Sequence, residues 1–253
     1  MRSIVYTFVA VALFFVSTAI AGSGHGAHWG YEGDVGPERW GGLSHEFEKC
    51  SKGKKQSPID IPSSAGASGH ELKLSYKPSS LRVINNGHTI QVNYDEGSYI
   101  TINGEKHHLL QFHFHTPSEN VVDGKPYDME AHLVHKSADG QLAVVGVFMK
   151  KGKHNPFLQT VWDNLPAKEG HEKTAAASIN VLDFLPADKS YYHFEGSLTT
   201  PPCSEGVKWH VMKTHVEVSA DQIATFANLF KANARPAQPL NGRKVLTGKA
   251  SAL

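Results

Sequence analysis

Two short segments of alternating residue character constrain this chain more than any other feature of its sequence. Residues 111–115 are Gln-Phe-His-Phe-His, and residues 130–134 are Glu-Ala-His-Leu-Val. Alternation with a period of two predicts a β-strand, because successive side chains of a strand point to opposite faces of the sheet. His113 and His115 then share one face with Gln111, while the two phenylalanines of the same segment point into a core.

The second segment repeats the arrangement. Glu130, His132 and Val134 share one face, and His135 points to the other. Residues 123–126, Asp-Gly-Lys-Pro, predict a turn between the two strands. If the strands lie side by side, three imidazoles converge, and three neutral histidines with an open fourth position are how proteins hold a catalytic zinc ion.

The polar neighbours of these histidines suit such a site. Gln111 and Glu130 lie in line with the histidines, where they would accept the spare ring N–H groups and fix the ring orientations. A lone histidine in a strand is more often an ordinary hydrogen-bonded side chain, and His-x-His alone is a weak signal. The third histidine, its carboxylate neighbour and the aromatic residues of the opposite face favour a metal site, but spacing alone leaves both interpretations open.

Three motifs together resemble those of the α-class carbonic anhydrases. They are residues 111–115, residues 130–135 (Glu-Ala-His-Leu-Val-His) and residues 196–202 (Gly-Ser-Leu-Thr-Thr-Pro-Pro). The similarity begins at residues 28–31, His-Trp-Gly-Tyr, and runs to residues 235–240, Arg-Pro-Ala-Gln-Pro-Leu. Several separate motifs in the same order argue against a chance match.

The resemblance implies a zinc enzyme that reversibly hydrates carbon dioxide to bicarbonate and a proton. The implied Zn²⁺ ligands are His113, His115 and His132. In this family the metal supplies zinc-bound hydroxide near neutral pH. The resemblance assigns Thr199 to accept a hydrogen bond from that hydroxide and to donate its own proton to Glu119. It assigns His88, in Asn-Asn-Gly-His, to relay the released proton to solvent. An exposed turn histidine is the plainer interpretation of His88.

The resemblance also implies an apolar pocket for carbon dioxide. Its expected residues are Val134, Val144, Leu198, Thr200, Val207 and Trp209. Strand parity places Val134 on the zinc face, and it gives Val207 and Trp209 a common face. Plain core packing is the alternative, and the two interpretations overlap because a pocket wall is also core. Sulfonamide-type and anion inhibitors are expected to bind a site of this kind.

Three positions depart from the common family pattern. Asn120 follows Glu119 where relatives often carry histidine, and Phe194 stands where tyrosine is common. Thr116 follows the second ligand, where animal enzymes have tryptophan. Bacterial members often resemble this chain at that position. None of these changes removes an implied zinc ligand. They therefore bear on the turnover rate and on the pKa values of groups in the site rather than on the type of reaction.

The N-terminus predicts export. Residues 4–16 are an apolar run preceded by Arg2, and residues 19–21, Ala-Ile-Ala, form a small-x-small cleavage pattern. We interpret residues 1–21 as a signal peptide and residues 22–253 as a single α-carbonic anhydrase domain. A membrane anchor is the alternative, but the run is too short to span comfortably. The mature protein should therefore be secreted or periplasmic.

Cys50 and Cys203 are the two cysteines of the chain. In an exported protein they favour a disulfide over two free thiols, and a matching pair occurs in secreted and bacterial members of the family. The bridge would pin the loop of residues 199–202. The alternative of a catalytic thiol lacks a paired histidine in the local sequence.

Composition and pattern predict one mainly β domain. The 25 Lys and Arg residues nearly balance the 24 Asp and Glu residues, which argues against a nucleic-acid partner. The expected strands are residues 72–76, 81–84, 89–94, 99–102 and 142–149; the expected helices are residues 156–162 and 219–232, with Ser219 as a possible cap; and residues 63–69 are an expected loop. The resemblance sharpens this to a large, twisted, mostly antiparallel sheet with short peripheral helices.

Two rival functions follow from the same residues. One is a secreted zinc-binding or adhesion module without turnover, although members that have lost catalysis typically lose a zinc histidine. The other is a different zinc hydrolase, which would need a positioned general base such as His-Glu-x-x-His, a motif that this sequence lacks. No segment after the N-terminal run is long and apolar enough to span a membrane. A homodimer is expected only because bacterial relatives are often dimers.

Overall fold

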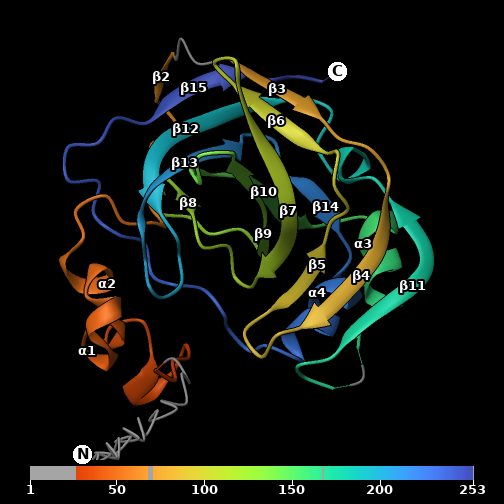
Figure 1. Ribbon diagram of the computed structural model, residues 1–253, viewed down its shortest axis with the longest axis horizontal. Coiled ribbons are helices and arrows are strands. Elements are labelled where there is room, and N and C mark those ends of the chain that lie inside the picture. Colours follow the sequence, from red (N-terminus) through yellow and green to blue (C-terminus); the bar gives the residue numbers. More distant parts are fainter. Residues whose placement is uncertain (1–26, 68–70, 167, 253) are drawn as a thin grey trace, which may run out of the picture.

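One large twisted sheet organises the protein, as the computed structural model shows for residues 27–67, 71–166 and 168–252 (Figure 1). In chain order the strands are β1 (Asp60–Ile61), β2 (Gly66–Ala67), β3 (Leu72–Ser75), β4 (Ser79–Asn85), β5 (Ile90–Asn93), β6 (Tyr99–Ile102), β7 (Glu105–His115), β8 (Val121–Val122), β9 (Met129–Ser137), β10 (Leu142–Lys151), β11 (Glu172–Ile179), β12 (Ser190–Ser197), β13 (Glu205–Met212), β14 (Val216–Val218), β15 (Leu246–Lys249) and β16 (Ser251–Ala252). Of these, 14 form the main sheet, and β1 pairs with β8 separately.

The long central strands set the topology of the sheet. Its main path runs β11-β4-β5-β7-β9-β10-β13-β12-β15-β2, with β14 beside β10 and the series β16-β3-β6 joined to β7. Neighbours along the centre are antiparallel except β10 and β13, which are parallel. The expected large, mostly antiparallel sheet is therefore confirmed, with a mixed character that the residue pattern did not specify.

Short helices surround the sheet. They are the α-helices α1 (Trp40–Leu43), α2 (Lys49–Lys52), α3 (Pro156–Trp162) and α4 (Ala220–Ala227) and the 3₁₀ helices η1 (Gly33–Val35), η2 (His45–Phe47) and η3 (Val181–Asp183). The helix expected over residues 156–162 is confirmed, with Asn155 as its N-cap. Ser219 caps α4 in a capping box with Gln222, as expected from its position.

Two expected elements differ from the structure by more than a residue or two at their ends. The second helix ends at Ala227 instead of residue 232, because the chain beyond it turns back and the N–H of Asn233 donates to the carbonyl of Thr116. The expected loop of residues 63–69 contains β2, which pairs in parallel with β15. A two-residue strand of glycine and alanine carries no alternation that could reveal it.

The sheet separates two apolar clusters. The larger one contains Phe112 and Phe114 of β7 and is covered by α3 and α4. The ring of Phe114 lies 4.9 Å from that of Trp162 and 6.2 Å from that of Phe226, centroid to centroid. The smaller cluster lies on the opposite face and includes Trp209. The phenylalanines of the first motif thus anchor β7 from behind and leave its histidines on the other face.

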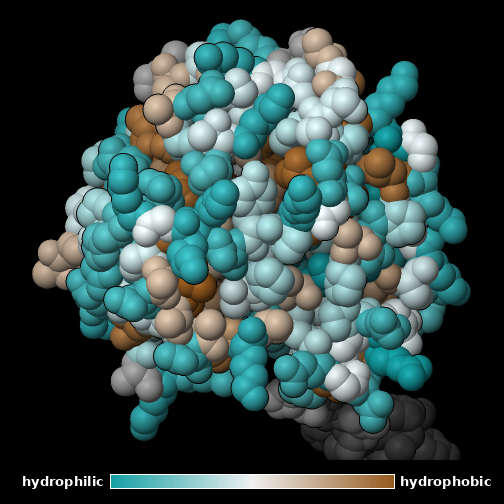
Figure 2. Space-filling model, turned by 180° about the vertical axis from the view of Figure 1, so that it is seen from behind, coloured by the Kyte–Doolittle hydropathy of each residue, from teal (hydrophilic) through white to brown (hydrophobic). Residues whose placement is uncertain are grey.

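The face opposite to the one seen in Figure 1 is largely hydrophilic. Seen from behind, apolar residues form small scattered groups among polar ones (Figure 2). Within the described ranges, no helix is both long and apolar enough to cross a membrane. The expected signal peptide, residues 1–21, lies outside the described residues and stays a prediction.

Candidate metal centre and active site

The candidate metal centre is built on the two neighbouring strands β7 and β9. They pair antiparallel, and the register places His113 directly opposite His132. A bulge between Leu109 and Gln111 interrupts the ladder, but regular alternation resumes at Gln111. Because residues i and i+2 share a face, His115 lies on the same side as the other two rings.

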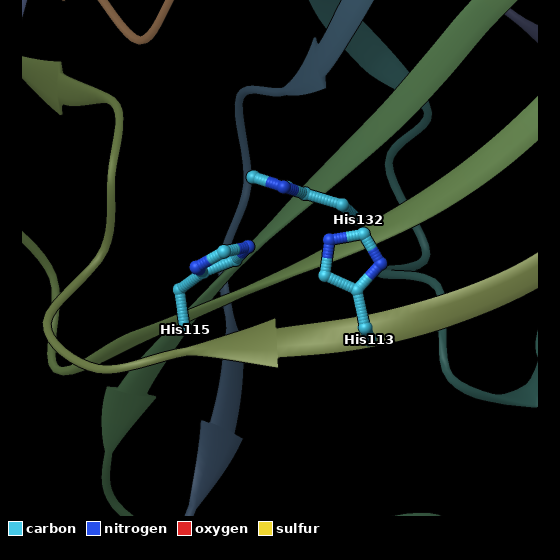
Figure 3. A group of neighbouring side chains, drawn as sticks. All are labelled: His113, His115 and His132. Carbon is cyan, nitrogen blue, oxygen red and sulfur yellow. The ribbon is translucent and has the colours of Figure 1, made fainter. Parts of the chain in front are cut away.

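The three imidazoles face one another across a common space (Figure 3). One potential ligand atom from each of His113, His115 and His132 lies within 4.8 Å of the others. Among the described residues, this is the one group of three or more histidine, cysteine or acidic side chains that is close enough to hold a metal ion. The distances and the all-imidazole donor set fit zinc.

Burial keeps these rings in the form that binds metal. Burial is the main cause that lowers the pKa of His113 and of His132 well below the ordinary value, and that lowers the pKa of His115 to about 4. A neutral imidazole keeps one nitrogen lone pair available as a ligand. The buried Nε2 of His115 has no hydrogen-bond partner in the described structure, as expected for an atom reserved for another ligand.

Hydrogen bonds orient two of the three rings, and a carboxylate lies beside the third. Nδ1 of His113 lies 2.9 Å from Oε1 of Gln111, and Nδ1 of His115 lies 2.7 Å from the carbonyl oxygen of Asn233. These oxygens only accept, so Nδ1 carries the proton in both rings and Nε2 remains for the metal. Nε2 of His132 lies 3.3 Å from Oε1 of Glu130, which leaves its Nδ1 toward the site.

Glu130 is itself held by the residue that departs from the family pattern. The main-chain N–H and the side-chain amide of Asn120 donate to its two carboxylate oxygens, each at 2.8 Å. Burial raises the pKa of Glu130 to about 7, and the hydrogen bonds from Asn120 oppose that rise. Asparagine therefore supplies the donors that orient this carboxylate.

Glu119 reaches the same centre from the loop after β7. Its Oε1 accepts from the main-chain N–H of Arg235 at 2.8 Å, and its Oε2 lies 3.5 Å from Nε2 of His115. Burial raises the pKa of Glu119 to about 8, and the main-chain N–H of Arg235 and the nearby side chain of Thr199 oppose the rise. Thr199 therefore lies near enough to influence Glu119, whose Oε2 has no hydrogen-bond partner among the described residues.

Five of the six expected pocket residues belong to one apolar cluster beside this centre. The cluster that contains them includes Val134, Val144, Leu198, Val207 and Trp209. The ring of Trp209 stands 4.8 Å from that of His132, nearly perpendicular to it, and Phe194 stacks on its other side with parallel rings 5.9 Å apart. Phenylalanine at position 194 thus extends the apolar wall.

A cavity of about 140 Å³ opens beside the histidines. His113, His115 and Gln111 line it together with Thr200 and His88. The imidazole of His88 stacks on the indole of Trp29, with ring centroids 3.7 Å apart and planes 8° from parallel. Burial lowers the pKa of His88, and the charge of Glu169 partly counteracts this.

The disulfide between Cys50 and Cys203 is present, as expected. The N–H of Cys203 donates to the carbonyl of Thr200, and the side-chain amide of Gln56 donates to the carbonyl of Cys203. The bridge therefore fixes the loop that carries Thr199. With both cysteines bonded, neither is available as a thiol nucleophile.

Comparison with known proteins agrees with this geometry. The family model for eukaryotic-type carbonic anhydrases matches residues 35–249. The chain belongs to the eukaryotic-type, or α, carbonic anhydrase family. It is an enzyme of the lyase type. Members of this family hydrate carbon dioxide, and α-carbonic anhydrases are in general zinc enzymes.

Individual relatives cover nearly all of this carbonic anhydrase. A carbonic anhydrase of Nostoc sp. is 50% identical over 225 residues, which cover 87% of this chain and 85% of the relative. One of Pectobacterium carotovorum is 43% identical over 239 residues, 94% of this chain and 98% of the relative. The solved α-carbonic anhydrase of Thermovibrio ammonificans, in complex with the inhibitor sulfanilamide, has a TM-score of 0.85 and 47% identity, covering 87% of this chain and 99% of that chain.

Sequence reasoning missed two residues of this carbonic anhydrase site. Asn233 holds His115 and Arg235 holds Glu119, both through main-chain groups of the segment that follows α4. The only sequence signal for these two roles was position, because the segment adjoins the C-terminal motif that starts at Arg235. Main-chain groups leave no mark in residue type, so the pattern could not assign them a role.

Proposed function

We propose that this protein hydrates carbon dioxide reversibly with a zinc ion held by His113, His115 and His132. The observation that carries the proposal is the convergence of three neutral imidazoles within 4.8 Å, of which His115 and His132 are buried and His113 is half-buried; hydrogen bonds orient the rings of His113 and His115. A zinc ion held by three such ligands lowers the pKa of bound water to about 7 and so supplies hydroxide near neutral pH.

Thr199 and Glu119 would orient the attacking nucleophile. A hydroxyl group has one proton, so when Thr199 donates it to the Glu119 carboxylate its oxygen must accept from the nucleophile. This directs a lone pair of the nucleophile at the substrate carbon. The main-chain N–H of Arg235 supports the role, because it binds the carboxylate oxygen at 2.8 Å and holds it in place.

Carbon dioxide would sit against the apolar wall formed by Val134, Val144, Leu198, Val207 and Trp209. Carbon dioxide carries no charge and no donor, so side chains without polar groups accommodate it and disfavour competing water. Thr200 lines the cavity on the histidine side, where it would contact the bicarbonate product. The wall adjoins His132 through Trp209, which supports this placement.

His88 would carry the proton away from the centre. It lines the same cavity as His113 and His115, and an imidazole exchanges protons near neutral pH. Burial lowers its pKa, which makes it a readier donor to solvent buffer. Replacing His88 with alanine should lower kcat in weak buffer and leave kcat/KM for carbon dioxide nearly intact, and added imidazole should restore kcat.

We further propose that the protein is exported after removal of residues 1–21 and acts in the periplasm or outside the cell. The Cys50–Cys203 disulfide supports this, because such bonds persist in oxidising compartments. Sulfonamide and anion inhibitors should bind at the three histidines, in line with the sulfanilamide complex of the Thermovibrio relative. A homodimer is part of the same proposal.

One assay tests the central proposal. Stopped-flow measurement of carbon dioxide hydration should show activity that a chelator abolishes and zinc restores. His132→Ala should lose both zinc and activity, whereas His135→Gln, three residues along the same strand on the opposite face, should keep zinc. Wild-type zinc content in His132→Ala would overturn the ligand assignment.

A further inference from the structure

One buried asparagine joins the turn that carries His88 to the strand that carries two metal ligands. Asn233 is 1% exposed and follows α4. It takes part in five hydrogen bonds, one with His88 and four with residues 114–116. These partners lie more than 100 residues away in sequence, so Asn233 connects the segment after α4 to both the His88 turn and β7.

The side chain of Asn233 makes the connection. Its Nδ2 donates to the carbonyl oxygen of His88 at 3.0 Å and to that of Phe114 at 2.9 Å. Phe114 lies between the two metal ligands of β7, so one amide group spans from the His88 main chain to the ligand strand. Its Oδ1 accepts from the N–H of Thr116 at 2.8 Å, which fixes the orientation of the amide.

The main chain of Asn233 does a separate task. Its carbonyl oxygen accepts from Nδ1 of His115, and its N–H donates to the carbonyl of Thr116 at 3.0 Å. Substitution of the side chain leaves both of these groups in the chain. The two tasks can therefore be separated by mutation.

Bonds within the turn fix the shape of the His88 turn, and Thr89 ties its downstream end to β7. Oδ1 of Asn86 accepts from the N–H groups of His88 and Thr89, which closes the turn on itself. Downstream, the hydroxyl of Thr89 donates to the carbonyl of Phe114 at 2.5 Å. At His88 itself, the hydrogen bond from Asn233 fixes the main chain against β7, and the stack on Trp29 fixes the ring.

We propose that the Asn233 side chain is a positioning residue for proton transfer, which holds the His88 main chain at a fixed distance from the metal-binding strand. Proton relay through ordered water requires aligned donors and acceptors, so a shift of His88 by a fraction of a hydrogen-bond length interrupts it. The amide suits this role because losing it leaves the half-buried carbonyl of His88 without its donor, whereas the carbonyl of Phe114 still accepts from Thr89. The inference rests on the proposed shuttle function of His88.

Asn233→Asp is the primary test. Aspartate keeps the oxygen that accepts from Thr116 and the main-chain bond to His115, but it places an oxygen where Nδ2 donated to two carbonyls. We expect kcat in dilute buffer to fall threefold or more, toward the value of His88→Ala. We expect kcat/KM for carbon dioxide to stay within about threefold of wild type and imidazole to restore kcat, a split that general destabilisation would not produce.

Matched variants separate the donor loss from other effects. Asn241→Asp makes the same chemical change at an exposed asparagine whose Nδ2 donates to the carbonyl of Lys54, and it should leave all parameters unchanged. Asn233→Ala removes the amide without adding charge, so it should show the same split and serves if the aspartate variant does not fold. Combining Asn233→Asp with His88→Ala should lower kcat no further than His88→Ala alone.

A spectroscopic measurement is independent of turnover. Stacking on Trp29 should shift the ring-proton NMR signals of His88 upfield, and Asn233→Asp should reduce that shift in the zinc-loaded protein and after zinc removal alike. If His88→Ala lowers kcat but neither Asn233 variant does, the inference is overturned while the shuttle stands. If His88→Ala leaves kcat unchanged in dilute buffer, the shuttle itself is overturned, and the inference with it.

Discussion

His135 should make the stability of this protein fall as the pH drops below neutral. It is fully buried on the opposite face of β9 from the metal centre, and its Nε2 lies 3.0 Å from the hydroxyl of Tyr76. Burial is the main cause that lowers its pKa from the ordinary 6.5 to about 3, and main-chain groups of Leu133 and Ala143 partly oppose the shift. In the unfolded chain nothing hinders protonation near pH 6.5.

The sign and size of the effect follow from that difference. Below pH 6.5 the unfolded state binds a proton that the folded state does not, so the contribution of His135 is complete above pH 6.5 and is lost as the pH falls toward 3. Each pKa unit corresponds to about 1.4 kcal/mol. Between pH 7 and pH 5 the loss from this residue alone should therefore be about 2 kcal/mol.

Urea unfolding at pH 7, 6 and 5 measures the loss of unfolding free energy that His135 causes. His135→Gln retains a group that can hydrogen-bond to Tyr76 but has no proton to gain, so its free energy of unfolding should depend less on pH than that of wild type by about 2 kcal/mol over this range. Zinc release and the titration of other groups affect wild type and His135→Gln alike. Their contributions therefore cancel when the pH dependences of the two proteins are subtracted. The same substitution at the exposed His154 is the control and should leave the pH dependence as it is.

Parallel curves for wild type and His135→Gln, agreeing within about 0.5 kcal/mol, would refute the reasoning, because the uncertainty of such measurements is smaller than the expected effect. An NMR titration gives a direct check. The ring signals of His135 should not move between pH 7 and pH 5 while the protein remains folded.

Two further predictions concern the loop of residues 199–203. Thr199→Ala should retain zinc but lower kcat by roughly 10–1,000-fold, because one oriented hydrogen bond to the nucleophile is lost; unchanged kinetics would show that the Thr199–Glu119 relay is wrongly assigned. Replacing both Cys50 and Cys203 with serine should lower the free energy of unfolding by about 5 kcal/mol in the loop-entropy model for the separation of 153 residues. Peptide mapping that finds free thiols in exported wild-type protein would contradict the premise of that comparison.

Alternation in the sequence predicted those parts of the site that strand geometry controls. The period of two in residues 111–115 separated histidines from phenylalanines, and the structure places His113 opposite His132 with the phenylalanines in the core behind them. Parity also put Val207 and Trp209 on a common face, and both lie in the apolar cluster beside the centre. These inferences needed only local periodicity and the pairing of two strands.

What the sequence left open depends on contacts between distant main-chain groups. The carbonyl of Asn233 binds His115 across 118 residues, and the N–H of Arg235 binds Glu119 across 116 residues. Every residue offers a carbonyl and all but proline an N–H, so side-chain identity gives no hint of which ones are used. The early end of α4 has the same origin, since the chain must turn back to bring Asn233 to β7.

The orientation of the three ligand rings by the protein itself has a consequence for metal exchange. Oxygen atoms of Gln111 and Asn233 orient the rings of His113 and His115, and Glu130 lies beside His132; the strands that carry the three rings are packed into the core on their far side. An arriving ion therefore orders few side chains, unlike the ion of a zinc finger, which must organise an unfolded peptide. We therefore expect the fold to persist without a metal ion, so that cobalt or another spectroscopically visible ion, added to the metal-free protein, should report on the geometry that the three histidines impose.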